Sequence, residues 1–193
     1  MRITAIKGQE KSKDRFSIYV DNRYCFSLTT NDLLDVKLKV GTEVGEQQIE
    51  QYKTLSEDSL MMARAYDKCL RRPHSEKEIR DYLRTKQVDE ELADRIIEKC
   101  YKYKLLDDEL FASKWVEHRR RANKSNRFIS GELRSKGISA SIVNAVLVDS
   151  DQAQLKVLIE KKSGRYSDER KLIAYLQGQG YGYSDIKSAL SSE

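Results

Sequence analysis

The chain has 193 residues, of which 39% are hydrophobic, 35% are charged and only one is proline, and its formal net charge is +5. A chain of this length and composition can bury a core and is typical of one or two helix-rich globular domains. No apolar run approaches the roughly 20 residues that a membrane span needs, and the first residues lack the apolar segment of a signal peptide, so we expect a cytoplasmic protein that does not bind membranes.

The N-terminal segment differs from the rest of the chain in its β-forming residues. These residues recur in rough alternation over residues 2–6, 15–20 and 24–28, which predicts three strands. Asp21-Asn22-Arg23 suits a hairpin turn, and the stretch 8–14 is expected to be a polar loop. Such a small antiparallel sheet cannot stand alone, so we expect it to pack against the first helices.

The rest of the chain is predicted to be helical. A short helix is expected over residues 29–36, with Thr29-x-x-Asp32 as a capping box, and a second one over residues 46–53. From Glu57 onward, N-cap and turn residues divide the sequence into nine helices in three groups of three. They cover residues 57–71, 75–86 and 89–103, then 107–121, 125–136 and 139–148, then 150–162, 167–177 and 183–191.

The second and third helices of each group recur as one unit. Successive copies are 50 and 43 residues apart, and a helix–turn–helix unit repeated at this period is typical of helical repeat proteins. The matching positions are Leu83, Leu133 and Leu176 before the turn and Val88, Ile138 and Tyr181 after it.

The turns of these units give two further predictions. Gly137 and Gly180 supply the positive-φ residue that commonly ends a helix. Gln87 stands at the same place in the first copy, so we predict a left-handed conformation there, at a cost of about 1 kcal/mol. After its turn the third copy is expected to hold one extra residue, which aligns Ile142 with Ile186.

The expected fold is therefore mainly α, an elongated array of three tandem three-helix repeats with a small N-terminal antiparallel β segment. The predicted boundaries are residues 1–55 for the β segment and residues 56–106, 107–149 and 150–193 for the repeats.

Positive charge is concentrated in one part of the sequence. Between Lys114 and Lys136 stand eight basic and two acidic residues, a net charge of +6, so the remainder of the chain sums to −1. Cations at a helix C-terminus explain one or two of these charges but not all of them. A local positive field of this size favours binding of nucleic acid or of an acidic protein surface.

Similar basic patches are expected in the first and third repeats. In the third repeat, Arg165, Arg170 and Lys171 also contribute. If the repeats stack, the patches would line one surface suited to an extended partner. The candidate binding residues are Arg71, Arg72, Arg80, Arg84, Lys86, Arg119, Arg120, Arg121, Lys124, Arg127, Arg134, Lys136, Lys161 and Lys162.

Other residue types give no sign of catalysis or of a cofactor. Aromatic residues accompany the basic run and could stack on bases, but Phe111 and Trp115 are four residues apart, which favours core packing. The three cysteines lack metal-ligand spacing and are expected to be reduced thiols. Asp107-Asp108 is better explained by helix capping than by a metal site. No glycine-rich phosphate loop or nucleophile–base pair is present, so we expect a protein without catalytic residues, cofactor or metal.

Nearly the whole chain resembles the RecX family of regulatory proteins. The residues that carry the resemblance are Ile3-Thr4-x-Ile6, Asp107-Asp108-x-x-Phe111-Ala112 and Glu132-Leu133-Arg134-x-Lys136-Gly137-Ile138-Ser139, together with the three tandem units. The resemblance implies a cytoplasmic bacterial modulator of the RecA recombinase, acting in DNA repair and the SOS response. Members of the family bind RecA, lodge in the groove of its filament on DNA, and usually inhibit strand exchange and filament growth.

Two hypotheses for the function follow. In the first, the chain is a non-enzymatic monomer that binds and modulates the RecA nucleoprotein filament, with weaker binding to single- and double-stranded DNA alone. Inhibition is the expected effect on the filament, and stabilisation of the filament is the alternative. In the second, it is a general basic helical protein that binds DNA directly, with an affinity that depends strongly on salt.

Overall fold

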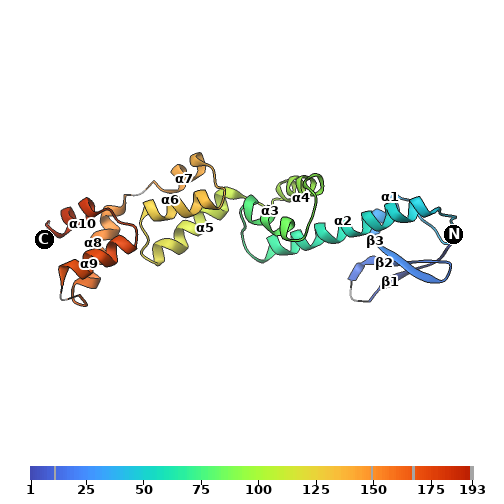
Figure 1. The fold of residues 1–193 in the computed structure, drawn as a ribbon, viewed down its shortest axis with the longest axis horizontal. Helices are drawn as coiled ribbons and strands as arrows, with labels where there is room; N and C mark the ends of the chain where they lie inside the picture. The colour runs from blue at the N-terminus through green and yellow to red at the C-terminus, as the bar shows by residue number, and fades with distance from the viewer. Residues whose placement is uncertain (11, 149, 167, 192–193) are drawn as a thin grey trace. The chain divides into compact units, whose positions relative to one another are not determined.

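The computed structural model describes residues 1–10, 12–148, 150–166 and 168–191 (Figure 1). The chain divides into two compact units, Met1–Lys68 and Cys69–Glu193. The fold is mainly helical with one small N-terminal sheet, as the sequence predicted.

The sheet of the N-terminal unit is antiparallel, with the strands in the order β1-β2-β3. The strands are β1 (Ile3–Gln9), β2 (Ser12–Val20) and β3 (Arg23–Thr29). Asp21 and Asn22 join β2 to β3 with φ angles of 48° and 66°, and two successive positive φ angles give the turn whose twist matches a hairpin. The predicted hairpin turn is therefore confirmed.

The predicted polar loop over residues 8–14 is too long. Gly8 pairs with Phe16 and Gln9 with Ser12, so both strands extend into the predicted loop. Backbone pairing across β1 and β2 overrides the weak β propensity of these polar residues. Residue 11, within this segment, lies outside the described residues.

The sheet packs against the first helices of its unit, as expected. Ile18 and Leu28 are fully buried, and Ile49, Tyr52 and Leu55 pack into the same cluster from the helix α2 (Glu46–Arg71). The short helix α1 (Thr30–Asp35) begins at the predicted capping box, in which the Thr29 hydroxyl accepts from the Asp32 amide and the Asp32 carboxylate accepts from the Thr29 amide.

Helix α2 (Glu46–Arg71) is one continuous helix of 26 residues. The sequence prediction of separate helices over 46–53 and 57–71 is therefore wrong. The residues between them, Thr54-Leu55-Ser56, include neither glycine nor proline, so nothing in them ends a helix.

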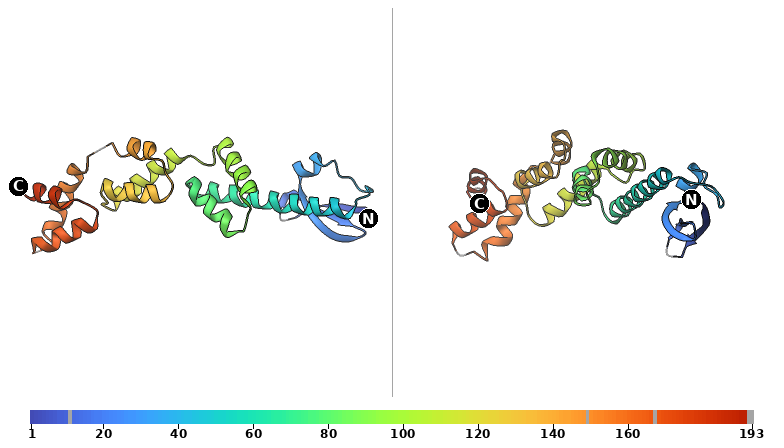
Figure 2. Two further views of the ribbon diagram at one scale, coloured as in Figure 1. Left: turned by 45° about the horizontal axis from the view of Figure 1, so that its top comes forward. Right: turned by 45° about the vertical axis from the view of Figure 1, so that its right-hand side comes forward.

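The C-terminal unit consists of three-helix modules (Figures 1 and 2). Module 1 combines the end of α2 with α3 (Glu76–Thr85) and α4 (Glu90–Lys102). Module 2 contains α5 (Asp108–Arg121), α6 (Asn126–Ser135) and α7 (Ala140–Val146). Module 3 contains α8 (Asp151–Ser163), α9 (Glu169–Gly178) and α10 (Tyr183–Leu190).

Modules 2 and 3 each have an apolar core of their own, and the repeat position before the turn is buried in all three modules. Leu83, Leu133 and Leu176 are all fully buried. Ile138 and Tyr181 are each 4% exposed after their turns. Cys69 and Cys100 are buried, Cys25 is partly buried, and all three are free thiols, as expected.

The turn between the second and third helix of each module has the predicted backbone. The φ angles of Gly137 and Gly180 are 82° and 98°, and Gln87 has a φ of 59°. The left-handed conformation predicted for Gln87 is confirmed.

The predicted extra residue in the third copy is wrong. The buried side chains are Val143 and Ile186, exposed by 1% and 0%, and the N-cap residues are Ser139 and Gly182. Both pairs keep the separation of 43 residues found before the turn. Because Ile142 and Val143 are adjacent and both apolar, the sequence pattern alone could not show which of them faces the core.

Candidate nucleic-acid-binding surface

The modules meet at two junctions of the same design. At the first, Asp108 of α5 accepts a hydrogen bond of 3.2 Å from the Glu76 amide at the start of α3. At the second, both carboxylate oxygens of Asp151 lie 2.9 Å from the backbone nitrogen of Asn126 at the start of α6 and accept its hydrogen bond. Burial raises the pKa of both carboxyls, and these backbone hydrogen bonds oppose it. Modules 2 and 3 therefore each cap the middle helix of the module before them.

The predicted capping pair Asp107-Asp108 serves two helices. The Asp107 carboxylate accepts from the Leu110 amide at 2.9 Å and caps its own helix α5. Its neighbour Asp108 caps α3, as described above, so a contact between modules accounts for the second carboxylate.

The glycine turns complete the junctions. Lys77 Nζ donates to the Ser135 carbonyl at 2.7 Å, next to the Gly137 turn. At the second junction, the Ser125 amide donates to the Gln179 carbonyl at 3.0 Å, and Lys124 Nζ lies 3.3 Å from the Gly178 carbonyl.

Glu78 is the charged centre of the first junction. Its side chain is 20% exposed, and it accepts from Lys136 Nζ at 2.6 Å. His74 Nδ1 lies 2.8 Å from the other carboxylate oxygen and Arg72 lies 3.0 Å from it. Burial alone raises the pKa of Glu78, but the hydrogen bonds from Lys136, His74 and Arg72 outweigh it and lower the pKa from 4.5 to about 2.

Replacing Glu78 with glutamine is expected to lower the free energy of unfolding by about 2 kcal/mol at neutral pH, with allowance for partial solvent exposure. Because the folded-state pKa lies below the unfolded value, this stabilisation is present above pH 4.5 and is lost as the pH falls towards 2. Denaturant unfolding of Glu78→Gln and of the unmodified protein across this range should show the difference shrinking with acid. Glu117→Gln, which removes an exposed carboxylate, is the control and should shift stability by less than about 0.5 kcal/mol. A difference that stays constant with pH would contradict this role of Glu78.

Lys136 and Arg119, two predicted binding residues, instead enclose Trp115. Lys136 Nζ lies 4.2 Å from the centre of the Trp115 ring, and the Arg119 guanidinium lies 4.8 Å from it. Glu132 accepts two hydrogen bonds of 2.7 Å from Arg119 and one of 2.9 Å from the indole of Trp115. Trp115 also stacks on the buried Phe111, so the predicted core packing of this pair is confirmed.

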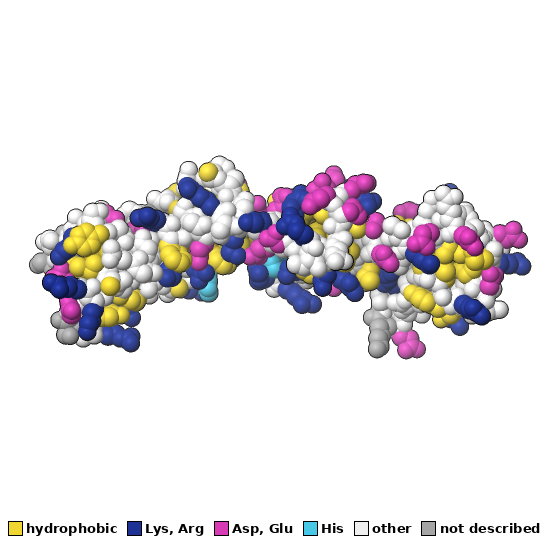
Figure 3. Space-filling model, viewed as in Figure 1, with side chains coloured by type: hydrophobic (Ala, Val, Ile, Leu, Met, Phe, Trp, Pro, Cys, Tyr) yellow, Lys and Arg dark blue, Asp and Glu magenta, His cyan; other side chains and the backbone are white. Residues whose placement is uncertain are grey.

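The predicted basic residues of α3 are largely neutralised. Arg80 lies 2.7 Å from both Glu76 and Asp94, and the hydrogen bonds that it donates to these carboxylates raise its pKa. Arg84 lies 2.8 Å from Asp81. Figure 3 shows Asp and Glu side chains gathered over α4, with Lys and Arg side chains beside them.

Several other candidates make intramolecular contacts of a weaker kind. Arg121 forms an exposed ion pair with Glu117. The ammonium groups of Lys86, Lys124 and Lys162 lie 5.9, 4.3 and 5.7 Å from the ring centres of Tyr82, Phe128 and Tyr175, respectively. The Arg120 side chain lies 3.5 Å from the Asn126 amide oxygen.

Four candidates remain exposed and form no side-chain hydrogen bond, ion pair or ring contact with other described residues: Arg71, Arg127, Arg134 and Lys161. Arg127 and Arg134 are seven residues apart on α6 and therefore lie on one face of that helix. Gly131 stands between them on that face, and no atom lies within 4 Å of where its Cβ would be. This open, positively charged face of α6 is the surface best placed to meet phosphate groups.

The second position of the middle helix is basic in all three modules. It is occupied by Lys77 in α3, Arg127 in α6 and Arg170 in α9. Lys77 is held against the Gly137 turn, whereas Arg127 and Arg170 are exposed. The hydrogen bond of Lys77 to the Ser135 carbonyl of the next module distinguishes the first position from the other two.

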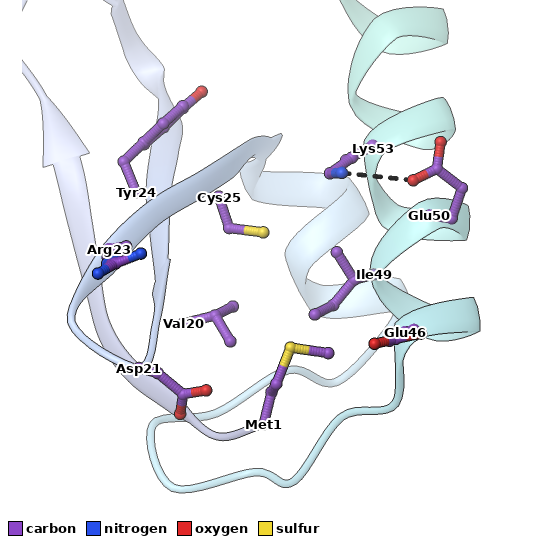
Figure 4. A pocket seen from close by; sticks show the side chains of 10 residues that line it. All are labelled: Met1, Val20, Asp21, Arg23, Tyr24, Cys25, Glu46, Ile49, Glu50 and Lys53. Atoms are coloured by element: carbon purple, nitrogen blue, oxygen red, sulfur yellow. Dashed lines mark hydrogen bonds and ion pairs between the residues drawn. The ribbon is translucent and has the colours of Figure 1, made fainter.

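A separate pocket lies in the N-terminal unit, between β3 and α2 (Figure 4). Its volume is about 610 Å³, and Val20, Cys25 and Ile49 form its apolar side. An ion pair of 3.3 Å between Lys53 and Glu50 stands at its rim. None of the predicted binding residues lines this pocket, and its mixed charges give no positive field.

The described part of the chain contains neither a metal-binding cluster nor a membrane-spanning helix. Its residues include no group of three or more His, Cys, Asp and Glu side chains placed to hold a metal ion. No helix among them is both long and apolar enough to cross a membrane.

Sequence comparison connects this architecture with known proteins. Residues 1–45 match the model of the RecX regulatory protein N-terminal domain. Residues 62–100 and 107–147 match the models of the first and second RecX three-helix domains. A regulatory protein RecX from Clostridium acetobutylicum is 32% identical, with 97% of this chain and 94% of the relative covered. A Bacillus subtilis relative of the same name is also 32% identical, over 97% of this chain and 75% of its own length.

Solved structures share the fold. A crystal structure of a regulatory protein RecX superposes with a TM-score of 0.76 and 26% identity, covering 97% of this chain and 98% of the other. A RecX structure from Lactobacillus salivarius has a TM-score of 0.57 at 23% identity and covers 69% of this chain, so it supports the fold alone.

Proposed function

Because this chain belongs to the RecX family of regulatory proteins, we propose that it regulates the RecA recombinase by binding the RecA filament on DNA. In this proposal binding inhibits ATP hydrolysis, strand exchange and filament growth, and the chain itself carries out no chemistry. It acts as a cytoplasmic monomer.

The observation that supports this proposal best is the open cationic face of α6. Arg127 and Arg134 extend from it without an intramolecular partner among the described residues. An arginine held by a carboxylate has little charge left for a ligand, whereas a free guanidinium can donate two hydrogen bonds to one phosphate. DNA enclosed in a RecA filament offers a regular series of phosphates to such a surface.

The module organisation supports binding to a polymer rather than to a small ligand. We take residues 1–55 as the N-terminal segment and residues 56–106, 107–149 and 150–193 as the modules. Three covalently linked modules offer three attachment points to successive RecA protomers, and the second and third attachments are intramolecular once the first has formed. A chain bound in this way would obstruct the groove into which a second duplex must enter.

A second candidate function is direct DNA binding, which the same free arginines also favour. The two candidates differ in what happens on naked DNA. A general DNA-binding protein would have its highest affinity for free DNA, with a steep salt dependence. A filament regulator would bind RecA-coated DNA more tightly, because RecA surfaces add to the phosphate interactions.

Sedimentation of preformed RecA filaments on single-stranded DNA separates the two candidates. We expect this protein to pellet with filaments at salt concentrations that release it from the same DNA without RecA. Equal retention on filaments and on naked DNA would support the DNA-binding alternative and argue against the RecA proposal.

A further inference from the structure

A groove of about 630 Å³ lies at the second junction, between α6 and the turn that joins α9 to α10. Arg127 and Phe128 line it from α6, and Tyr181 and Tyr183 line it from the other side. Grooves of this size accept small organic groups. The combination of aromatic rings with an arginine is one that recognises nucleotides.

The equivalent place at the first junction has different chemistry. Phe128 is replaced there by Glu78, and Tyr183 by Ala140. Lys77 replaces Arg127 and spans that junction to the Ser135 carbonyl, at 2.7 Å. Charged side chains therefore occupy this place at the first junction, whereas aromatic side chains and one guanidinium line an open groove at the second.

The charges around the groove favour a phosphate beside Arg127. The carboxylate of Glu132, which also lines the groove, is already neutralised by Arg119 at 2.7 Å. Asp185 lies against Gly182 at the start of α10, and its negative charge disfavours a phosphate at that helix end. The Arg127 side of the groove is therefore the part that suits a phosphate group.

Tyr183 is the ring best placed for stacking. It is 55% exposed as the first residue of α10. Phe128 is partly buried, and its ring already has the Lys124 ammonium 4.3 Å from its centre. Tyr181 is only 4% exposed and forms part of the module core.

We propose that this groove holds one unstacked base of a single-stranded nucleic acid, with the base on the Tyr183 ring and its neighbouring phosphate on Arg127. This inference rests on the proposed association with DNA and adds a specific site to it. Stacking on an aromatic ring tolerates any base, so the site would confer a preference for single strands without a preference for sequence.

A single-stranded oligonucleotide that contains 2-aminopurine tests this site with the full chain and without RecA. Stacking on the Tyr183 ring should quench the probe as protein is added. Tyr183→Ala should weaken binding about tenfold and remove the quenching at saturation, whereas Tyr183→Phe should keep both. Arg127→Gln should weaken binding and lower its salt dependence while leaving the quenching at saturation.

Tyr103→Ala is the matched control, because Tyr103 is 56% exposed and lies in module 1. It should behave like the unmodified protein, and a duplex of the same sequence should not be quenched. Equal effects of Tyr103→Ala and Tyr183→Ala, binding that saturates without quenching, or no binding at all would each overturn the proposed site. If such a result were obtained and the protein still bound RecA filaments, the proposed regulation of RecA would stand without this site. If quenching depended on Tyr183 and the protein did not bind filaments, the site would be supported and the proposed regulation of RecA would be contradicted.

Discussion

Replacing Arg127 and Arg134 together with glutamine is expected to weaken binding to RecA filaments about ten- to a hundredfold, because two phosphates are then no longer neutralised. Both side chains are exposed on one face of α6 and form no hydrogen bond or ion pair with other described residues. Their removal should therefore leave the free energy of unfolding nearly unchanged. On naked single-stranded DNA, the slope of log affinity against log salt should fall by about 0.7 for each of these phosphates. Titration of labelled filaments and of labelled DNA at several salt concentrations measures both effects.

The matched control is the double variant Arg84→Gln with Arg121→Gln. It removes the same net charge from residues that are also exposed, but each of these arginines already faces a carboxylate, Asp81 or Glu117. We expect affinity to fall by no more than about threefold, since an exposed ion pair shares its charge with its partner. If the two double variants weaken binding equally, the long-range field of the chain matters and the free face of α6 does not.

Substitution of Gly180 by alanine is expected to destabilise the C-terminal unit by about 3 kcal/mol. The φ of 98° costs an L-residue about 1 kcal/mol or more. An added Cβ would also lie 2.5 Å from Ser125 Oγ and 2.6 Å from Phe128 Cβ, and relieving such overlap costs about 1–3 kcal/mol. Denaturant unfolding should show this decrease in stability.

Gly178→Ala provides a control two residues away. Gly178 ends α9, and no atom lies within 4 Å of an added Cβ there. Alanine at a helical position should leave stability unchanged or raise it by up to about 1 kcal/mol. Similar decreases for the two alanine variants would show that the close approach of module 2 to the Gly180 turn is unimportant.

The same close approach explains why the three turns differ in sequence. Gly137 also has a neighbouring module within contact, since its Cβ would lie 2.9 Å from the Lys77 Cβ. Gln87 has the same left-handed backbone but an exposed side chain, so only the backbone cost applies. Glycine is thus required where a left-handed turn packs against the preceding module, and the sequence pattern revealed only the left-handed turn.

Local and periodic features of the fold were predictable from the sequence. The repeat of Leu83, Leu133 and Leu176 identified buried positions, and Thr29 and Ser139 marked helix starts correctly. The errors arose where several local choices were equally good. Ile142 and Val143 are adjacent apolar residues, and nothing in Thr54-Leu55-Ser56 signals either a helix end or its continuation.

The candidate site was less predictable, because the state of a cation depends on partners far away in the sequence. Lys136 pairs with Glu78, 58 residues before it, and Arg119 pairs with Glu132 on the next helix. A count of basic residues treats these cations and the free Arg127 alike. In the sequence Glu78 stands out only as the fourth residue of Ser75-x-x-Glu78, a capping-box pattern of which the structure forms only the Ser75 half.

ATP hydrolysis by RecA on single-stranded DNA, followed while this protein is titrated in, tests the central claim most directly. We predict that hydrolysis falls at protein concentrations well below that of RecA, because one molecule bound to a filament or its end affects many protomers. The Arg127→Gln/Arg134→Gln variant should need about ten times more protein for the same effect, in proportion to its weaker binding. A rate of hydrolysis that is unchanged at every ratio of the two proteins would contradict the proposed inhibition of RecA.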